Sequence, residues 1–548
     1  MGADQPADAA ATSSQASAGA PADAPDPRTP VPTLAPLAVP DYRRMWGAAV
    51  ISHLGTFLQM TAAPWLMLEL TGSAFLTSLV TAFLLLPRLL LTLPAGALAD
   101  VVDRRTLLVV GNLIGAAAVG TMALLSAAGQ LGAVAILVLT LTLGSGSAIA
   151  MPAFQTLVPD LVPRSLLPQA ITLNSGAFNV ARAVGPAIGG ALIATGLASL
   201  AFGLNALSFL VVVAVLFTLP RDHVEDVAKS PRSLVRATVT GVRYARFSPA
   251  IRLLLVLSGV FALTAASVQA LLAPASVELG LGASGFGTLW GVFGVGALLG
   301  VGTREQARLR LGRWMVPASM VLFGLGGMVF GLAPTPALAA SGLFATGLAW
   351  VWVLITLNAT VQLLAPHWVR SRVVAIYALV VGLQPVGALL AGALAEPTSA
   401  GTAIAASTAV TLLAGLAATR LDLPVLGEVE APESGGLGIL PELRDAAVTG
   451  PVVVHRRWEV AAEDLDEFLA QARLAHHVRR RTGARRWELH RDAIVHTQFT
   501  EVVEYADWEE HLLQRTRLDA EDLALLRHLW SLDVHGEPDT VLLTPMEP

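Results

Sequence analysis

Long apolar runs recur through the first three quarters of the chain, and they constrain its fold more than any other feature. A helix that crosses a bilayer needs about 20 consecutive, mostly apolar residues. Of the 548 residues, 54% are hydrophobic and only 14% are charged, against ~25% charged residues in soluble domains. The sequence therefore predicts a multi-pass α-helical membrane protein and argues against a disordered chain or a purely soluble enzyme.

Twelve segments are long and apolar enough to span a membrane, six on each side of a polar stretch, 220–249. They lie at 46–69, 74–98, 106–127, 131–152, 169–194, 197–219, 250–273, 284–302, 314–332, 336–356, 373–394 and 399–419. Alternate connections are rich in arginine, as in Arg104-Arg105 and Arg370-Ser-Arg372, while the others contain no Lys or Arg. Because positive loops stay in the cytoplasm, we expect both termini to be cytoplasmic.

A short internal repeat divides the membrane part into two halves. The segment 155–165, Gln-Thr-Leu-Val-Pro-Asp-Leu-Val-Pro-Arg-Ser, recurs in similar form at 362–371. Each copy follows the fourth span of its set of six. Two six-helix halves, 41–219 and 250–420, related by an axis along the membrane normal are therefore predicted.

The two ends of the chain differ from the membrane part in composition. Residues 1–40 are rich in Ala, Pro, Ser and Asp and predict a disordered tail without the basic start of a secretory signal. A Pro, Gly and Glu-rich linker, 421–449, leads to a polar, acidic segment, 450–548. That segment predicts a cytoplasmic α+β domain.

The order of elements in the C-terminal segment is β-α-β-β-α-β, which is the ferredoxin-like arrangement. Asp507 and Asp519 are predicted N-caps, and Gly483 a predicted C-cap that follows the basic turn 479–481. The predicted strands are 451–460, 485–491, 494–505 and 539–544, and the predicted helices are 462–482, 507–516 and 519–530.

Two motifs in the membrane part carry a family resemblance. The segment 96–105, Gly-Ala-Leu-Ala-Asp-Val-Val-Asp-Arg-Arg, resembles the cytoplasmic-loop signature of the major facilitator superfamily. The resemblance implies a gate in which Gly96 lets two helices approach, Asp100 and Asp103 are the acidic positions, and Arg104 and Arg105 anchor at the membrane surface. The alternative is an ordinary positive-inside loop.

The fifth predicted span contains Gly-Pro-Ala-Ile-Gly-Gly, which resembles the signature of antiporter-type exporters in this superfamily. Its residues are Gly185, Pro186, Gly189 and Gly190. Glycines allow tight helix contact and proline bends a helix, so simple packing is the alternative explanation.

Together with Arg182 and the C-terminal segment, these motifs resemble one branch of the superfamily. That branch contains the enterobactin exporter and related bacterial siderophore and drug exporters, the longer of which have a C-terminal extension. The resemblance implies export across the bacterial cytoplasmic membrane, driven by proton antiport. The expected partners are a small-molecule substrate, protons and the lipid bilayer, and no nucleic acid.

Two arginines, Arg88 and Arg182, fall in the middle of predicted spans where no Asp or Glu matches their depth. An arginine at the bilayer centre costs at least ~2.5 kcal/mol, so it faces a partner or a cavity. We hypothesise that both attract an anionic or catecholate substrate; backbone carbonyls or water are the alternative partners. The amides that are further substrate candidates, or else bond between helices, are Gln59, Asn174, Asn179, Asn358 and Gln362.

Proton coupling needs a group that changes its protonation. His53 has the appropriate intrinsic pKa, and Glu69 and Asp100 are the alternatives. A single histidine in a membrane span is more often a packing residue.

The C-terminal segment gives no sign of a metal or cofactor. Eight of the 11 histidines lie there, including His476 and His477, but without cysteines or metal-ligand spacing. Solvated surfaces are the preferred explanation. The segment also resembles dimeric ferredoxin-like domains that include antibiotic-biosynthesis monooxygenases, and we expect a regulatory or self-association module. Two alternatives to an exporter remain: a membrane-anchored enzyme whose C-terminal domain carries out the chemistry, and a lipid flippase of the same fold.

Overall fold

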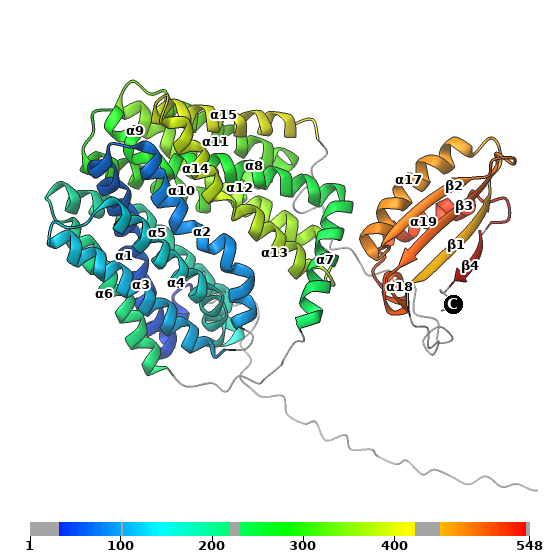
Figure 1. Cartoon of the computed structure of the whole chain (residues 1–548), viewed down its shortest axis with the longest axis horizontal. Coiled ribbons are helices and arrows are strands. Elements are labelled where there is room, and N and C mark those ends of the chain that lie inside the picture. Colours follow the sequence, from blue (N-terminus) through cyan, green and yellow to red (C-terminus); the bar gives the residue numbers. More distant parts are fainter. Residues whose placement is uncertain (1–31, 100–101, 220–230, 422–449, 537, 544–548) are drawn as a thin grey trace, which may run out of the picture.

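The computed structural model describes residues 32–99, 102–219, 231–421, 450–536 and 538–543. It consists of a large helical body and a smaller α+β domain at one end of that body (Figure 1). The expected disordered tail lies almost entirely outside the described residues, as does most of the expected 421–449 linker.

The first half of the body contains six long helices that pack around apolar cores. Glycine and alanine line many of the contacts, because without a hydrophobic driving force helices in lipid associate through close packing. The helices are α1 (Pro40–Thr71), α2 (Ala74–Ala99), α3 (Arg104–Ala127), α4 (Ala133–Asp160), α5 (Leu167–Ala194) and α6 (Ala198–Thr218).

The second half repeats this arrangement with two changes. Its helices are α8 (Pro249–Ala270), α9 (Leu272–Glu278), α10 (Ala283–Leu311), α11 (Met315–Gly331), α12 (Pro336–Leu364), α13 (Arg370–Val381), α14 (Gln384–Ala395) and α15 (Ala400–Ala418). The short α9 extends the seventh span. The eleventh span is broken between α13 and α14, where Pro385 removes a helical hydrogen bond and its ring crowds the carbonyl four residues before it.

Ten stretches of the described chain qualify as membrane spans by length and apolar composition. One of them, Ala283–Gly331, contains both α10 and α11, and α1, with 32 residues, adds the first span. Each of the twelve predicted spans therefore coincides with a helix or a broken helix. The prediction of a twelve-helix body is confirmed.

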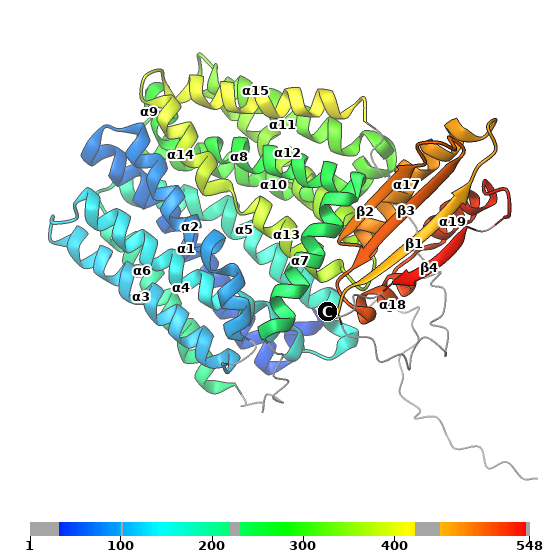
Figure 2. The ribbon, with the colours of Figure 1, turned by 45° about the vertical axis from the view of Figure 1, so that its right-hand side comes forward.

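The polar stretch between the halves contains a helix that the sequence analysis did not predict. This is α7 (Pro231–Phe247), which packs on α8 and α13 (Figure 2). It lies at the end of the body where the arginine-rich connections gather. We call this the arginine-rich end, and the opposite end, near α9, the arginine-poor end.

The C-terminal domain has one four-stranded antiparallel sheet in the order β2-β3-β1-β4. Its strands are β1 (Val452–Glu459), β2 (Arg486–Arg491), β3 (Gln498–Tyr505) and β4 (Asp539–Leu543). Helices α17 (Leu465–Thr482) and α19 (Ala520–Ser531) pack on one another beside the sheet, and α18 (Trp508–Thr516) follows β3 (Figure 1). This confirms the predicted ferredoxin-like order.

Local signals explain most element boundaries in this domain. Asp507 and Asp519 accept hydrogen bonds from the backbone N–H groups of Glu510 and Asp522, as N-caps do. The strand predicted at 494–505 begins only at Gln498. The reason is a turn in which the Asp492 carboxylate accepts from the N–H groups of residues 494 and 495.

Candidate translocation pathway

The two halves of the body meet along α5 and α10, and at Gly190, Gly287 and Gly294 the two backbones approach without intervening side chains. A methyl group added at Gly287 would lie 2.5 Å from the carbonyl oxygen of Pro186, and one added at Gly294 would lie 2.5 Å from Cα of Ala183. Gly190 faces Gly287 in the same way. We call this contact the half-to-half seam. Its backbones touch because neither helix carries a bulky side chain there.

The other two glycines of the fifth-span motif face a different helix. A methyl group at Gly185 would lie 2.6 Å from Cβ of Phe57, and one at Gly189 would lie 3.1 Å from Cβ of Thr61, both on α1. The motif therefore presents one glycine pair to its own half and Gly190 to the other half. It fixes the spacing of α5 between α1 and α10.

A polar contact closes the arginine-poor end. The carboxylate of Glu396, which follows α14, accepts hydrogen bonds from Oγ of Ser73 and the N–H of Phe75 at 3.2 and 3.1 Å. Ser73 and Phe75 begin α2 of the other half. A carboxylate is favourable at a helix N-terminus because it meets free N–H groups and the positive end of the dipole.

A small cavity of about 30 Å³ lies between the halves near this closed end. Its walls are mostly apolar, with Met60 and Trp290 among them, and Gln269 comes from the second half. Gln59 also lines it, but that side chain accepts a hydrogen bond from Asn205 at 2.5 Å and contacts Met122. Gln59 therefore ties three helices of its own half together.

A larger cavity of about 610 Å³ lies along α12 and α13. Asn358 and Gln362 line it and hydrogen bond to one another, and Tyr377 joins them. The hydroxyl of Tyr377 donates to the carbonyl of Leu354 at 3.2 Å. Of the substrate candidates, these two amides are the ones that the structure brings together in a cavity.

The two intramembrane arginines have different surroundings. Arg182 is buried in the half-to-half seam, and its guanidinium lies 4.8 Å from the ring centre of Phe293 and 5.7 Å from that of Trp350, both in the second half. Arg88 has an exposed side chain on α2. Neither lines the two cavities described above.

The remaining candidates of the first half are separated along the helices. His53 is half-buried, lies 5.3 Å from the ring of Phe178, and its Nε2 makes no hydrogen bond with the described residues. Glu69 is exposed at the arginine-poor end of α1. Asn179 donates to the carbonyl of Ser175 in its own helix, and Asn174 is half-buried.

The loop motif after α2 ties helices of one half together. Asp103 is the N-cap of α3, Arg104 pairs with Asp160 at the end of α4 at 2.8 Å, and Arg105 lies over the ring of Phe217 in α6. Asp100 lies outside the described residues. Gly96 lies in the part of α2 whose surroundings are not described.

A family model described as transmembrane secretion effector, in the major facilitator superfamily, matches residues 31–544. The chain belongs to this family. Its members are membrane transporters, so the prediction of a transporter rather than an enzyme is confirmed.

Relatives that are named as transporters match part of this transporter's length. The multidrug efflux pump Tap of Mycolicibacterium fortuitum is 26% identical over 392 residues, which are 70% of this chain and 95% of that protein. Tap of Mycobacterium tuberculosis H37Rv is 27% identical over 411 residues, 71% and 94% of the two chains. The staphyloferrin A transporter of Staphylococcus aureus is 28% identical over 176 residues, 32% and 44% of the two chains.

Solved structures support the fold of this transporter. A bacterial homologue of the human lysosomal transporter Spinster, in an inward-facing and unoccupied conformation, covers 70% of this chain and 96% of its own, with a TM-score of 0.54 and 16% identity. The nucleoside transporter NupG covers 69% of this chain and 99% of its own, with a TM-score of 0.57 and 15% identity. The match covers nearly the whole length of Tap but about 70% of this chain.

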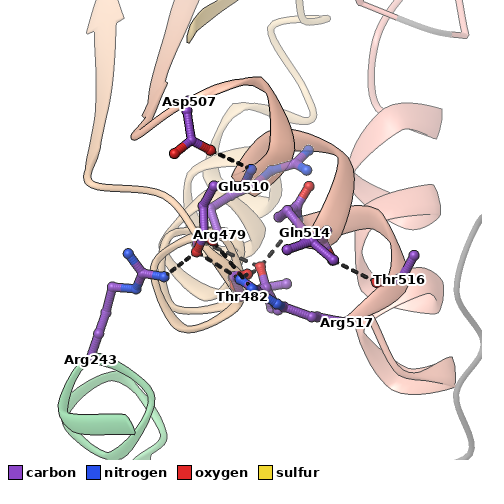
Figure 3. Close-up of polar contacts among 10 residues, drawn as sticks. Arg243, Arg479, Thr482, Asp507, Glu510, Gln514, Thr516 and Arg517 are labelled. Atoms are coloured by element: carbon purple, nitrogen blue, oxygen red, sulfur yellow. Dashed lines mark hydrogen bonds and ion pairs between the residues drawn. The ribbon is translucent and has the colours of Figure 1, made fainter. Parts of the chain in front are cut away.

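The C-terminal domain of this transporter docks on the arginine-rich end, mostly through residues that the sequence did not single out. Arg480, from the basic turn 479–481, is the exception. Arg243 of α7 pairs with Glu510 of α18 at 2.6 Å (Figure 3). Arg517 lies 4.7 Å from the ring of Trp368, which precedes α13, and Arg480 lies 4.7 Å from the ring of Phe247. We call this set the domain contact. The sequence signal that could have revealed this surface is the amphipathic pattern of 231–247, the residues of α7.

The histidine pair of α17 also belongs to this region. His476 and His477 stack on one another with ring centres 5.3 Å apart, and His476 stacks on Trp487 and lies near Phe247. Both are half-buried. The expectation of simple solvated surfaces was wrong for these two, because α7 and β2 cover them.

Proposed function

We propose that this transporter exports hydrophobic, drug-like compounds from the bacterial cytoplasm by alternating access. The observation that carries the proposal is the match to Tap over nearly that protein's whole length, combined with the cavity of about 610 Å³ along α12 and α13, whose walls are mostly apolar. An apolar pocket with few polar groups accepts many hydrophobic shapes. It does not by itself select one substrate.

The proposed orientation places the arginine-rich end and the C-terminal domain in the cytoplasm. Support comes from the loops, because Lys and Arg concentrate at one end of the bundle. The contact of Glu396 with Ser73 and Phe75, which we call the arginine-poor latch, then lies on the outer side of the membrane. In this orientation the protein rests in an inward-facing state, with its larger cavity, along α12 and α13, available to cytoplasmic substrate.

The proposed transport step is a rocking of the two halves that parts the half-to-half seam near Gly190 and Gly287. Glycine contacts suit such a step, since no side chains must disentangle when the backbones separate. Gly185 and Gly189 keep α5 bound to α1, so that α5 moves with its own half. The arginines at 104 and 105 keep that half rigid by tying α3 to α4 and α6.

A proton gradient is the proposed energy source, with His53 as the group that takes up the proton. Its Nε2 makes no hydrogen bond with the described residues, so no described neighbour competes for its lone pair. The ring lies against Phe178 of α5, so a change of charge there acts on a helix that lines the half-to-half seam. Glu69 is exposed at the end of α1 and is the weaker candidate.

An anionic siderophore is the second candidate substrate. It is favoured by Arg182, a buried cation whose described contacts are aromatic rings rather than carboxylates. An anion that reached the seam would relieve the cost of burying this charge.

Uptake into everted membrane vesicles tests these proposals. Vesicles with the wild-type protein receive a cationic dye or a catecholate siderophore, each with and without an imposed proton gradient, and vesicles with H53Q serve as the coupling control. We expect gradient-driven dye uptake that H53Q abolishes. Uptake of the siderophore alone would replace the first substrate class with the second. Uptake of neither compound would contradict drug export.

A further inference from the structure

Four arginines converge on a cavity of about 80 Å³ inside the C-terminal domain, away from the translocation pathway. It lies between β1 and the helices α17, α18 and α19. This volume is several times the ~10–15 Å³ that one water needs. The residues that line it are Arg456, Arg479, His511, Gln514, Arg515, Leu518, Leu523, Leu526, Arg527 and Trp530.

The charge of this cavity is not balanced by the acidic group beside it. Arg456 pairs with Glu501 at 2.9 Å, and Nε of Arg479 lies 3.6 Å from the same carboxylate. Burial alone would raise the pKa of Glu501, but the two arginines outweigh burial and lower it, so the carboxylate is ionised. One negative charge therefore faces two guanidinium groups, each less than a tenth exposed.

Several hydrogen-bond donors around the cavity have no acceptor among the described residues. They are Nη2 of Arg479, Nε of Arg515 and Nε1 of Trp530, whereas Nε of Arg479 faces Glu501 and the same guanidinium also contacts the hydroxyl of Tyr505. Buried polar groups in proteins are nearly always paired, so a set of unpaired donors around one cavity indicates an absent partner. Burial and the repulsion from Arg456 also lower the pKa of Arg479, and an added anion would relieve both effects.

The chemistry of the walls selects the kind of anion. Burial, with repulsion from Arg456, Arg515 and Arg479, lowers the pKa of His511 to about 4, so its ring is neutral near pH 7 and adds no charge. A planar guanidinium matches a carboxylate with two parallel hydrogen bonds. The opposite wall is apolar. It is formed by Leu518, which precedes α19, and by Leu523, Leu526 and the indole of Trp530 in α19. A metal cation is excluded by the positive charge.

We propose that this cavity binds a small organic carboxylate and that its occupancy strengthens the domain contact. The carboxylate lies between Arg479 and Arg515, with Nε1 of Trp530 as a further donor, and its apolar body lies against the leucines. The site is distinct from the transport substrate site and from the proposed pathway.

A chain of hydrogen bonds joins the cavity to the transporter (Figure 3). Gln514, which lines the cavity, donates to Oγ1 of Thr482 at 3.1 Å. Arg517 donates to the carbonyl of Thr482 at 2.8 Å and to Glu510 at 2.7 Å, and Glu510 in turn binds Arg243 of α7. An occupant that orders α18 on the cavity side therefore also orders the residues that hold α7.

Binding is tested on the full-length protein in detergent, with benzoate, hexanoate, phosphate and the neutral benzamide as probes. We expect benzoate and hexanoate to raise the melting temperature and benzamide to leave it unchanged. The R515Q and W530F variants each remove one donor and should weaken benzoate binding, R515Q by about tenfold, typical of a lost charge-assisted hydrogen bond. R473Q, on the exposed side of α17, is the matched control and should bind normally.

The effect on docking is measured by fluorescence transfer between dyes at V242C in α7 and I494C in the β2–β3 turn, which become the sole cysteines of the chain. Benzoate should raise the fraction of docked molecules. Binding with no change in transfer would overturn the coupling. No shift with any anion, an equal shift with benzamide, or phosphate acting more strongly than benzoate would overturn the site as proposed.

Discussion

The half-to-half seam and the domain contact join parts of the same chain by different means. At the seam, backbone meets backbone, as at Gly190 and Gly287. At the domain contact, Arg243 pairs with Glu510, and Arg480 and Arg517 lie over aromatic rings. In lipid, helices gain stability from close packing rather than from hydrophobic transfer. Beside water, a half-buried pair of charges holds two surfaces together and releases them when conditions change.

This difference predicts how each contact fails. A contact between backbones has no room for a side chain and fails through added volume. A contact between charges has room to rearrange and fails through lost charge or added salt.

The largest effect is expected for G287L in the half-to-half seam. The added side chain meets the carbonyl of Pro186 and Cα of Gly190, and neither backbone atom can rotate away. Overpacking of this kind costs about 1–3 kcal/mol or more, so dye export should fall at least about tenfold. G203L is the matched control, because nothing lies within 4 Å of Cβ at that position in α6. Export at the wild-type rate by folded G287L would contradict a closed seam.

The next effect is expected for R243Q at the domain contact. It removes a hydrogen bond between charged groups, which contributes about 1.5–3 kcal/mol. The dye pair at V242C and I494C should report a loss of the docked population, whereas R473Q should leave it unchanged. Raising the salt to ~1 M should weaken docking in the wild type, since the Debye length falls to about 3 Å. G287L leaves the domain contact intact, so its docking should show the same dependence on salt as the wild type.

A smaller effect is expected for R182Q, which removes the guanidinium from the rings of Phe293 and Trp350 across the seam. Desolvated cation–π contacts contribute about 1–2 kcal/mol. The arginine-poor end should open more often. A single cysteine at Ala63, a residue that lines the small cavity, should then react faster with an impermeant maleimide. R182K should show a weaker effect, and unchanged labelling in R182Q would show that the rings do not hold the seam.

The smallest effect is expected for E396Q at the arginine-poor latch. The carboxylate is exposed and its partners are Ser73 and the N–H of Phe75, so its contribution is about 0.2–1 kcal/mol. Labelling of the same cysteine should rise by no more than about fivefold. E69Q, exposed at the same end and without a hydrogen bond to the described residues, should give no change.

Much of the fold could be predicted from the sequence because the signals were local. Each membrane span is a run of apolar residues, and the run itself fixes the helix in lipid. In the C-terminal domain, Asp507 and Asp519 cap the helices that they were predicted to cap. The break at Pro385 and the late start of β3 differ from prediction. In each case one local feature, the proline ring or the turn at Asp492, outweighs the pattern of apolar residues around it.

The sites could be predicted only in part. The sequence placed Asn358 and Gln362 together, since they lie one turn apart on a helix, and both line the larger cavity. It could not show that Gln59 hydrogen bonds to Asn205 or that Arg182 lies over aromatic rings, because these partners are distant in the chain. The roles of His53 and Asp100 stay predictions.

The basic turn 479–481 shows where local sequence stops being informative. From the sequence, all three arginines are equivalent cations at a helix end. In the structure, Arg479 faces Glu501 and the anion cavity, Arg480 covers Phe247 of the transporter, and Arg481 pairs with Asp522. Successive residues on a helix point about 100° apart, so each one meets a different neighbour.

The twelve spans, the two halves, the ferredoxin-like order and the family resemblance can all be predicted from the amino-acid sequence, because periodicity, composition and caps act over a few residues. The folded structure is needed to show which glycines form the half-to-half seam, which charges form the domain contact, and that four arginines enclose one cavity. Those arrangements join residues far apart in the chain, and pairing of that kind depends on how complete surfaces pack.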